Sequence, residues 1–206
     1  MCLVVSRSGS PHAETGKTVR YLTLANQLTI LRMLLIPAFV LLVVYEHLGA
    51  ALAVFVVAGL TDALDGLIAR TAGQRTSLGA WLDPMADKLL LVTTFIVLTL
   101  PGLPLQHHVP LWLTVLIISR DVVIVSVVAV VNLAIGHRTF SPSVWGKLAT
   151  ASYIVLVVVI MYFNWRREPS LLVESMIWIS LMLTVLSSAD YLIRVRRLVN
   201  HDQPPS

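Results

Sequence analysis

Residues 61–88 read TDALDGLIARTAGQRTSLGAWLDPMADK and place four aspartates inside an otherwise apolar part of the chain. Apolar runs flank the stretch on both sides, VFVVAG before it and LLLVTTFIVL after it. An apolar surrounding makes an ionised carboxylate costly, and neighbouring like charges add to that cost. The four acids therefore need either protonation or a bound cation, and they mark a candidate site. They are Asp62, Asp65, Asp83 and Asp87.

The composition of the whole chain is that of a membrane protein. Of its 206 residues, 57% are hydrophobic and 13% are charged, whereas a soluble domain carries about 25% charged residues. The net charge of +4 does not indicate a nucleic-acid partner, because the basic residues are scattered at the ends of apolar segments. A single cysteine, Cys2, excludes an internal disulfide.

Six segments are long enough to cross a membrane, which takes about 20 mainly apolar residues. We therefore expect an all-α, polytopic membrane protein whose six transmembrane helices form one bundle within residues 22–197. Residues 1–21 are expected to be a mobile N-terminal tail, and residues 198–206 a disordered C-terminal tail. The six predicted helices are Leu22–Tyr45, Ala50–Ala69, Gly79–Leu100, Val109–Ile135, Trp145–Phe163 and Leu171–Ile193.

The distribution of Lys and Arg predicts the orientation of these helices, because cytoplasmic loops are enriched in both residues. On one side lie only Arg166 and Arg167, and the other side carries most of the positive charge. Both termini and the loop within residues 70–79 are therefore expected in the cytoplasm. The basic residues on that side are Arg7, Lys17, Arg20, Arg70, Arg75, Arg138, Lys147, Arg194, Arg196 and Arg197.

In an antiparallel pair of helices the four acids come to equal depths, Asp62 opposite Asp87 and Asp65 opposite Asp83. The two acids on each helix, Asp62 with Asp65 and Asp83 with Asp87, also lie within a narrow arc of about 100° or less, so two acidic stripes can face each other. Small residues beside the acids would let the two backbones approach. These small residues are Gly66, Ala69 and Gly79.

Carboxylates without His or Cys are hard oxygen ligands, which suit Mg²⁺ or Mn²⁺ and not zinc. Two divalent cations sharing bridging carboxylates would neutralise all four acids. The alternative is a polar helix seam in which some of the acids are protonated.

The stretch spells Asp-x2-Asp-Gly-x2-Ala-Arg-x8-Gly-x3-Asp-x3-Asp from Asp62 to Asp87. This pattern resembles the signature of the CDP-alcohol phosphatidyltransferase family, whose six-helix architecture would also fit the whole chain. The resemblance implies a site for two divalent cations, Mg²⁺ or Mn²⁺, and transfer of a phosphatidyl group from CDP-diacylglycerol to an alcohol, with release of CMP. It also implies that Asp62, Asp65, Asp83 and Asp87 hold the metals and that Asp87 accepts the proton of the attacking hydroxyl. The residues implied in CDP-diacylglycerol binding are Asp62, Gly66, Ala69, Arg70 and Gly79.

Arg120 and Asp121 lie in the middle of the fourth predicted helix. Adjacent residues point about 100° apart, so we expect that the two do not neutralise each other. Arg120 is then a candidate ligand for an acceptor phosphate, assisted by Lys147. Alternatively, Arg120 pairs with an acid on another helix. Arg32, in a run that resembles the family's Asn-x-Leu-Thr-x2-Arg, either contacts substrate or metal ligands or pairs with one of the acids.

The acceptor alcohol is less clearly marked. Leu82–Lys88 resembles the corresponding run of phosphatidylglycerophosphate synthases, which use glycerol 3-phosphate. Ser119-Arg120-Asp121 replaces their usual Arg-Glu and, like the AGLTDALDG run, is similar to mitochondrial-type cardiolipin synthases, which use phosphatidylglycerol. We expect glycerol 3-phosphate as the acceptor and keep phosphatidylglycerol as the alternative.

A third reading is a cation-coupled membrane transporter, since paired acids within a membrane also serve ion transport. The acids cluster near one membrane face and no second helix pair repeats them, which favours the enzyme. The expected location is a bacterial inner membrane, with the active site facing the cytoplasm and membrane lipids around it. The oligomeric state stays open, a homodimer included.

Overall fold

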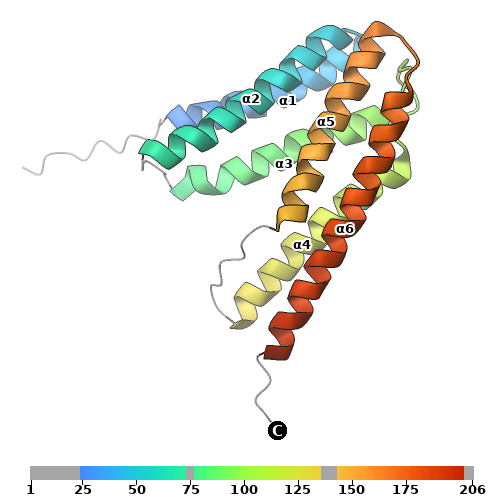
Figure 1. Cartoon of the computed structure of the whole chain (residues 1–206). Coiled ribbons are helices and arrows are strands. Elements are labelled where there is room, and N and C mark those ends of the chain that lie inside the picture. Colours follow the sequence, from blue (N-terminus) through green and yellow to red (C-terminus); the bar gives the residue numbers. More distant parts are fainter. Residues whose placement is uncertain (1–23, 73–76, 136–142, 202–206) are drawn as a thin grey trace, which may run out of the picture.

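The computed structural model describes the backbone of residues 24–72, 77–135 and 143–201, and the side chains of residues 30–61, 88–127, 143–194 and 196. Within these ranges the regular structure is entirely helical (Figure 1), which confirms the predicted all-α fold. The helices are α1 (Leu24–Val44), α2 (Leu48–Ala72), α3 (Ser77–Thr99), α4 (Leu111–Ile135), α5 (Val144–Arg166) and α6 (Leu171–His201).

The largest difference from the predicted helices is at the C-terminal end. There α6 continues to His201, beyond the predicted end at Ile193 and into the segment that was expected to be a disordered tail. Hydropathy marks where a helix leaves an apolar layer, which need not be where the helix ends. Arg194 Nε donates to Asp190 Oδ2 at 2.9 Å, a pairing one turn apart that favours helix. Residues 202–206 and the predicted N-terminal tail lie outside the described residues.

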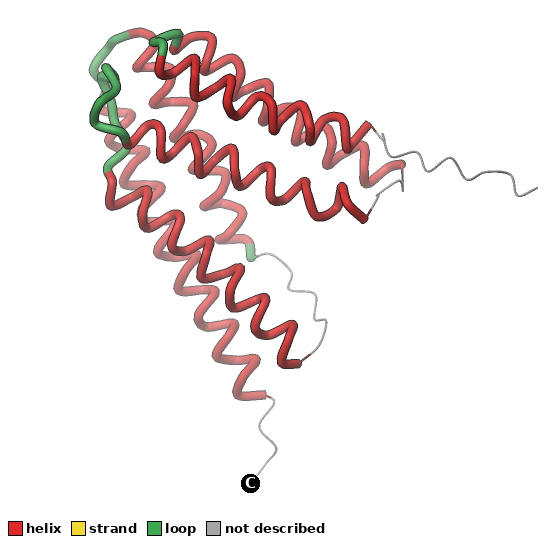
Figure 2. The backbone as a smooth tube through the Cα atoms, turned by 180° about the vertical axis from the view of Figure 1, so that it is seen from behind, coloured by secondary structure: helices red, strands yellow, loops and turns green. Residues whose placement is uncertain are grey.

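The helices form two groups that diverge from a common end. Helix α1 packs against α2 and α3, while α4 packs against α3 and α6. Helix α5 contacts α2, α3 and α6 and so joins the two groups (Figure 1). Figure 2 shows the described loops gathered at the common end, apart from the short piece that precedes α5. The end of α2 and the start of α3 lie at the other end of their group, and the chain reverses direction between successive helices (Figures 1 and 2).

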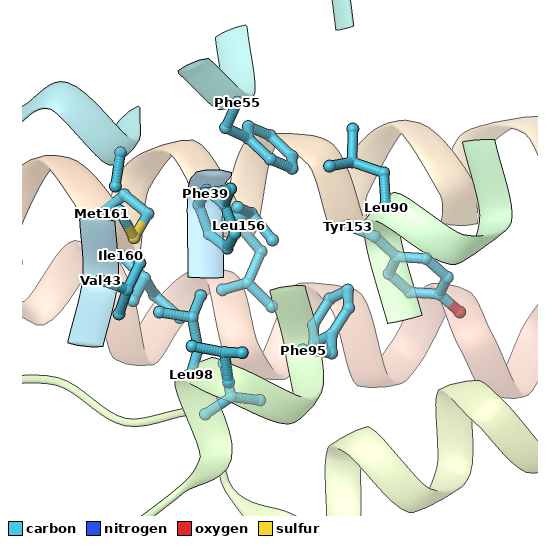
Figure 3. Close-up of a cluster of buried hydrophobic side chains, with 14 of the residues drawn as sticks. Phe39, Val43, Phe55, Leu90, Phe95, Leu98, Tyr153, Leu156, Ile160 and Met161 are labelled. Carbon is cyan, nitrogen blue, oxygen red and sulfur yellow. The ribbon is translucent and has the colours of Figure 1, made fainter. Parts of the chain in front are cut away.

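The core is built around α5, whose buried side chains meet those of α1, α2 and α3 (Figure 3). Phe39 and Phe55 pack with their ring centroids 6.1 Å apart, and Phe95 meets Tyr153 edge to face at 5.9 Å. Such aromatic pairs add about 0.5–1.5 kcal/mol to the stabilisation from burial. Tyr153 lies at the edge of this cluster, with its hydroxyl pointing away from it (Figure 3).

Two helical segments among the described residues are long and apolar enough to cross a membrane, Val144–Arg166 and Leu171–Arg194, with mean hydropathy of 2.0 and 1.8. Shorter apolar stretches lie in the first three helices, at Ile30–Val44, Leu48–Thr61 and Lys88–Thr99. Large apolar side chains are exposed on the outer surface, for example Leu34 at 64% and Met182 at 65%. An apolar surface of this kind suits a lipid surrounding. The number of membrane spans and the side on which the termini lie stay predictions.

The long loop between α3 and α4 is fixed to α5 by one buried amide. The backbone N–H of His107 donates to Asn164 Oδ1 at 2.7 Å, and Asn164 Nδ2 donates to the His107 carbonyl at 2.9 Å. Asn164 is 1% exposed. Both hydrogen bonds join residues far apart in the chain, so they hold the common end of the two helix groups together.

Candidate active site

The acid motif lies at the end of its helix group that is remote from the described loops. Asp62 and Asp65 belong to α2, and Asp83 and Asp87 belong to α3. Figure 1 shows α2 and α3 running in opposite directions, as the predicted antiparallel pair requires. That the acidic stripes face each other stays a prediction, because these side chains lie outside the described ones. The predicted roles of Gly66, Ala69, Arg70 and Gly79 also stay predictions, because these residues lie in the same part of the chain.

A pocket of about 140 Å³ lies between α3, α4 and α5. An apolar cavity of about 150 Å³ is large enough for a benzene molecule, so this volume suits a phosphate or a small polyol better than an acyl chain. The first residue of its wall, Lys88, follows Asp87 in the chain. The lining residues are Lys88, Leu91, Val92, Phe95, Ile117, Ile118, Arg120, Asp121, Thr150 and Tyr153.

The charged side of this pocket is a network of three side chains from α3 and α4. Arg120 Nη1 donates to Asp121 Oδ1 at 2.8 Å, and Lys88 Nζ lies 3.5 Å from Asp121 Oδ2. Asp121 therefore bridges the two cations. The expectation that Arg120 and Asp121 do not neutralise each other was wrong. Their Cα–Cβ bonds diverge by about 100°, but the long arginine side chain bends around the helix far enough to reach its neighbour.

Hydroxyl groups of α6 form hydrogen bonds with two residues that line the pocket, Arg120 and Tyr153. Arg120 Nη2 donates to Ser187 Oγ at 2.6 Å, and the Tyr153 hydroxyl lies 2.6 Å from Thr184 Oγ1. Thr184 uses its single hydroxyl hydrogen in a 2.6 Å bond to the Ser180 carbonyl, so Tyr153 is the donor to Thr184. The three α6 residues are buried, and their bonds tie α6 to α4 and α5.

The sequence matches the family model for CDP-alcohol phosphatidyltransferase over residues 22–186, a range that includes the acid motif and the pocket. The chain belongs to the CDP-alcohol phosphatidyltransferase family. Family membership makes it a transferase of phospholipid biosynthesis and a membrane protein, and it favours the enzyme over the transporter.

Curated relatives of this phosphatidyltransferase carry two different activities in their names. It is 36% identical over 200 residues to a "Probable phosphatidylglycerophosphate synthase" of Mycobacterium tuberculosis, covering 91% of this chain and 90% of that protein. It is 32% identical over 173 residues to the CDP-diacylglycerol–glycerol-3-phosphate 3-phosphatidyltransferase of Haemophilus influenzae, covering 80% and 89%. It is 45% identical to human cardiolipin synthase (CMP-forming), but over 107 residues, which are 52% of this chain and 34% of the human protein.

Of the three residues predicted to bind an acceptor phosphate, the structure brings only Arg120 into the pocket of this phosphatidyltransferase. Arg32 is buried in α1 at 1% exposure, and Lys147 is exposed in the first turn of α5. Neither lines the pocket, so a part for them in acceptor binding stays a prediction.

Three polar residues of this network had not been predicted as site residues: Lys88 and Asp121, which line the pocket, and Ser187, which binds Arg120. A signal for Ser187 is present in the sequence, since Ser180, Thr184 and Ser187 recur at helical spacing along one face of an otherwise apolar segment. Lys88 follows the acid motif directly, and its Nζ lies 3.5 Å from Asp121 Oδ2. The residue directly after the acid motif is therefore paired with an acid of α4.

Among the side chains that the structure describes, no three His, Cys, Asp or Glu lie close enough together to hold a metal ion. The acid motif lies outside these side chains and is still the candidate metal site. Its donor set fits a hard divalent cation, because all four ligands are carboxylates. The helical backbone at these positions also places Asp62 and Asp65 on one face of α2, and Asp83 and Asp87 on one face of α3.

Proposed function

We propose that this protein transfers a phosphatidyl group from CDP-diacylglycerol to glycerol 3-phosphate, giving phosphatidylglycerophosphate and CMP. The observation that carries the proposal is a pocket with two cationic side chains, Arg120 and Lys88, that starts at the residue after the acid motif. The similarity to the two glycerol 3-phosphate-type relatives, which extends over most of the chain, supports this acceptor.

The acid motif would bind the donor and two divalent cations, Mg²⁺ or Mn²⁺, through Asp62, Asp65, Asp83 and Asp87. When bound, the cations stabilise the charge that develops on the phosphoryl oxygens and on the leaving CMP. The donor's cytidine and pyrophosphate would lie along the end of α2 and the start of α3. Besides Asp62, the residues assigned to it are Gly66, Ala69, Arg70 and Gly79.

Asp87 has the second role of accepting the proton from the attacking hydroxyl of the acceptor. That oxygen forms the new bond to phosphorus, the bond between the two phosphates of the donor breaks, and CMP leaves with the electron pair. A carboxylate is a weak base near neutral pH, so its contribution depends on holding the hydroxyl close. Asp87 precedes Lys88 in α3, so a phosphate held in the pocket keeps the rest of a small acceptor near that carboxylate.

Arg120 is the acceptor's principal phosphate ligand in this proposal, and Lys88 is the second. The Arg120 side chain is 10% exposed, which reduces the competition from water. Guanidinium groups bind phosphate through several N–H donors at once. Asp121 holds both cations while the acceptor is absent, and the incoming phosphate competes with it for them.

In the membrane, we assign six spans with both termini and the acid motif on the cytoplasmic side. Successive helices run in opposite directions (Figure 1), and the loops predicted outside the cytoplasm gather at one end of the bundle (Figure 2). In this orientation glycerol 3-phosphate reaches the site from the cytoplasm, the side on which CMP is also released. A bacterial inner membrane matches the sources of the two relatives that this chain covers most fully.

A cardiolipin synthase activity, with phosphatidylglycerol as acceptor, is the second candidate. The 45% identity to human cardiolipin synthase over 107 residues favours it. The charge of the pocket fits it as well, because the carboxylate of Asp121 offsets one of the two cations, Lys88 and Arg120, and leaves one net positive charge. A single positive charge matches the single negative charge of a phosphodiester.

The test is to incubate the purified protein with CDP-diacylglycerol and Mn²⁺ plus either glycerol 3-phosphate or phosphatidylglycerol, and to identify the product by mass. Phosphatidylglycerophosphate supports the proposal, and cardiolipin with no phosphatidylglycerophosphate overturns it in favour of the second candidate. In the same assay Arg120→Ala should raise the apparent KM for glycerol 3-phosphate roughly ten- to hundredfold and spare the KM for CDP-diacylglycerol. Arg166→Ala is the matched control, since Arg166 is exposed in the last turn of α5, where its partner is Glu168. A normal acceptor KM with impaired donor binding would contradict the role of Arg120.

A further inference from the structure

The guanidinium group of Arg120 is held by residues from two different helices. Asp121, its neighbour in α4, accepts from Nη1 at 2.8 Å, and Ser187 of α6 accepts from Nη2 at 2.6 Å. Ser187 is 2% exposed, so water cannot readily replace it. Two bonds to separate nitrogens fix both the position of the guanidinium and the orientation of its plane.

The bond to Ser187 decides which N–H groups of Arg120 stay available. The guanidinium has five N–H donors, and within the described structure Asp121 and Ser187 take one each, while the buried Nε has no hydrogen-bond partner. Without Ser187, the group is free to turn and present a second nitrogen to the carboxylate of Asp121. Bidentate pairing of this kind is the favoured geometry of arginine with a carboxylate. It would withdraw Arg120 from the pocket.

Gly146 provides the space for this arrangement at the start of α5. A Cβ atom at this position would lie 3.4 Å from Arg120 Nη2 and 3.7 Å from Ser187 Oγ. A methyl group would just touch the guanidinium, and a branched side chain would displace it. The backbone of α5 therefore passes so close to the Arg120–Ser187 bond that residue 146 has room for no side chain larger than a methyl group.

We propose that Ser187 is a positioning residue for the acceptor, acting through Arg120, and that Gly146 keeps open the space for their contact. This inference rests on the proposed function of Arg120 as the ligand of the acceptor phosphate. Ser187 itself touches no substrate. By engaging Nη2, it keeps the guanidinium from pairing with Asp121 through a second nitrogen, so that the unused N–H groups can receive a phosphate.

The experiment measures the apparent KM for glycerol 3-phosphate and for CDP-diacylglycerol in Ser187→Ala, Arg120→Ala and the double variant. Ser187→Ala should raise the acceptor KM about tenfold, the effect of losing a hydrogen bond to a charged group, and leave the donor KM unchanged. In the Arg120→Ala background the same change should have no further effect, because its partner is gone. Ser187→Thr, which keeps the hydroxyl, should restore most of the acceptor affinity.

Two controls separate positioning from general damage to the fold. Ser188→Ala removes the neighbouring hydroxyl, which donates to the Thr184 carbonyl of its own helix at 2.8 Å, and should leave both KM values unchanged. Gly146→Val should raise the acceptor KM, whereas Gly59→Val in α2 should not, since a Cβ at Gly59 meets no atom of the described structure within 4 Å. An altered acceptor KM in either control variant, Ser188→Ala or Gly59→Val, would overturn the assignment.

The outcomes distinguish this inference from the function on which it rests. If Arg120→Ala raises the acceptor KM and Ser187→Ala does not, the proposed function stands and the role of Ser187 is refuted. An equal effect of Ser187→Ala with and without Arg120 also refutes it, because Ser187 would then act on the fold and not through Arg120. A normal acceptor KM in Arg120→Ala removes both proposals together.

Discussion

Replacing Asn164 by leucine should weaken the common end of the two helix groups without altering the pocket. The substitution removes the two hydrogen bonds that the Asn164 side chain makes with the loop before α4, with lengths of 2.7 and 2.9 Å. A buried polar group that loses its partner costs about 1–3 kcal/mol. Because His107 is partly exposed, water satisfies its backbone in part. We therefore expect a total destabilisation of about 2–3 kcal/mol.

For a chain of this length, about 1 kcal/mol shifts the thermal midpoint by about 2–4 °C. The midpoint of detergent-solubilised Asn164→Leu should accordingly fall by roughly 4–12 °C. Hydrogen exchange of the backbone in residues 100–110 should become faster, because the protected N–H of His107 is released. The KM values for both substrates should stay close to those of the unchanged protein, since the loop and the pocket lie at different places along the bundle.

The matched control for this prediction is Gln106→Leu, which makes the same chemical change one residue before His107. Gln106 is exposed, so its substitution should leave the thermal midpoint within about 1–2 °C. If Asn164→Leu behaves like Gln106→Leu in both unfolding and exchange, the two hydrogen bonds do not hold the loop. The account of the common end would then be refuted.

Three further predictions concern the chemistry and the pocket wall. Chelation with EDTA should abolish CMP release and added Mg²⁺ or Mn²⁺ should restore it, whereas full activity in chelator would remove the metal assignment of the four aspartates. Asp87→Asn should lower turnover about 10²–10⁴-fold while binding of CDP-diacylglycerol, measured directly, is largely retained; near-normal turnover would exclude Asp87 as the base. Tyr153→Phe should cost about 0.5–1.5 kcal/mol of stability, seen as a lower thermal midpoint, because it removes one hydrogen bond to Thr184 and keeps the ring contact with Phe95. An unchanged midpoint in that variant would mean that the bond contributes no net stability.

The helices and the candidate metal ligands could be predicted from the sequence because both depend on local patterns. Apolar runs of about 20 residues and the polar turns between them located each helix to within a few residues, apart from the end of α6. The spacing of the acids identified the family, which the family match over residues 22–186 confirms. The end of α6 was misplaced because the helix continues past its apolar part, where the pairing of Asp190 with Arg194 supports it.

The partners of Arg120 could not be predicted in the same way. Its pairing with Asp121 depends on the path of a long side chain, which the direction of the Cα–Cβ bond does not determine. Its bond to Ser187 joins residues 67 positions apart, and no local pattern in either helix specifies that contact.

The bundle of apolar helices and the carboxylate motif on two successive helices could therefore be read from short segments of the chain, because hydropathy, helical period and residue spacing are local properties. The surroundings of the pocket, in contrast, depend on contacts between helices. Packing of α3, α4, α5 and α6 brings Lys88, Asp121 and Ser187 to Arg120, and the space beside Gly146 makes room for the guanidinium. These contacts depend on how separate helices meet, which is set by the packing of all their side chains together.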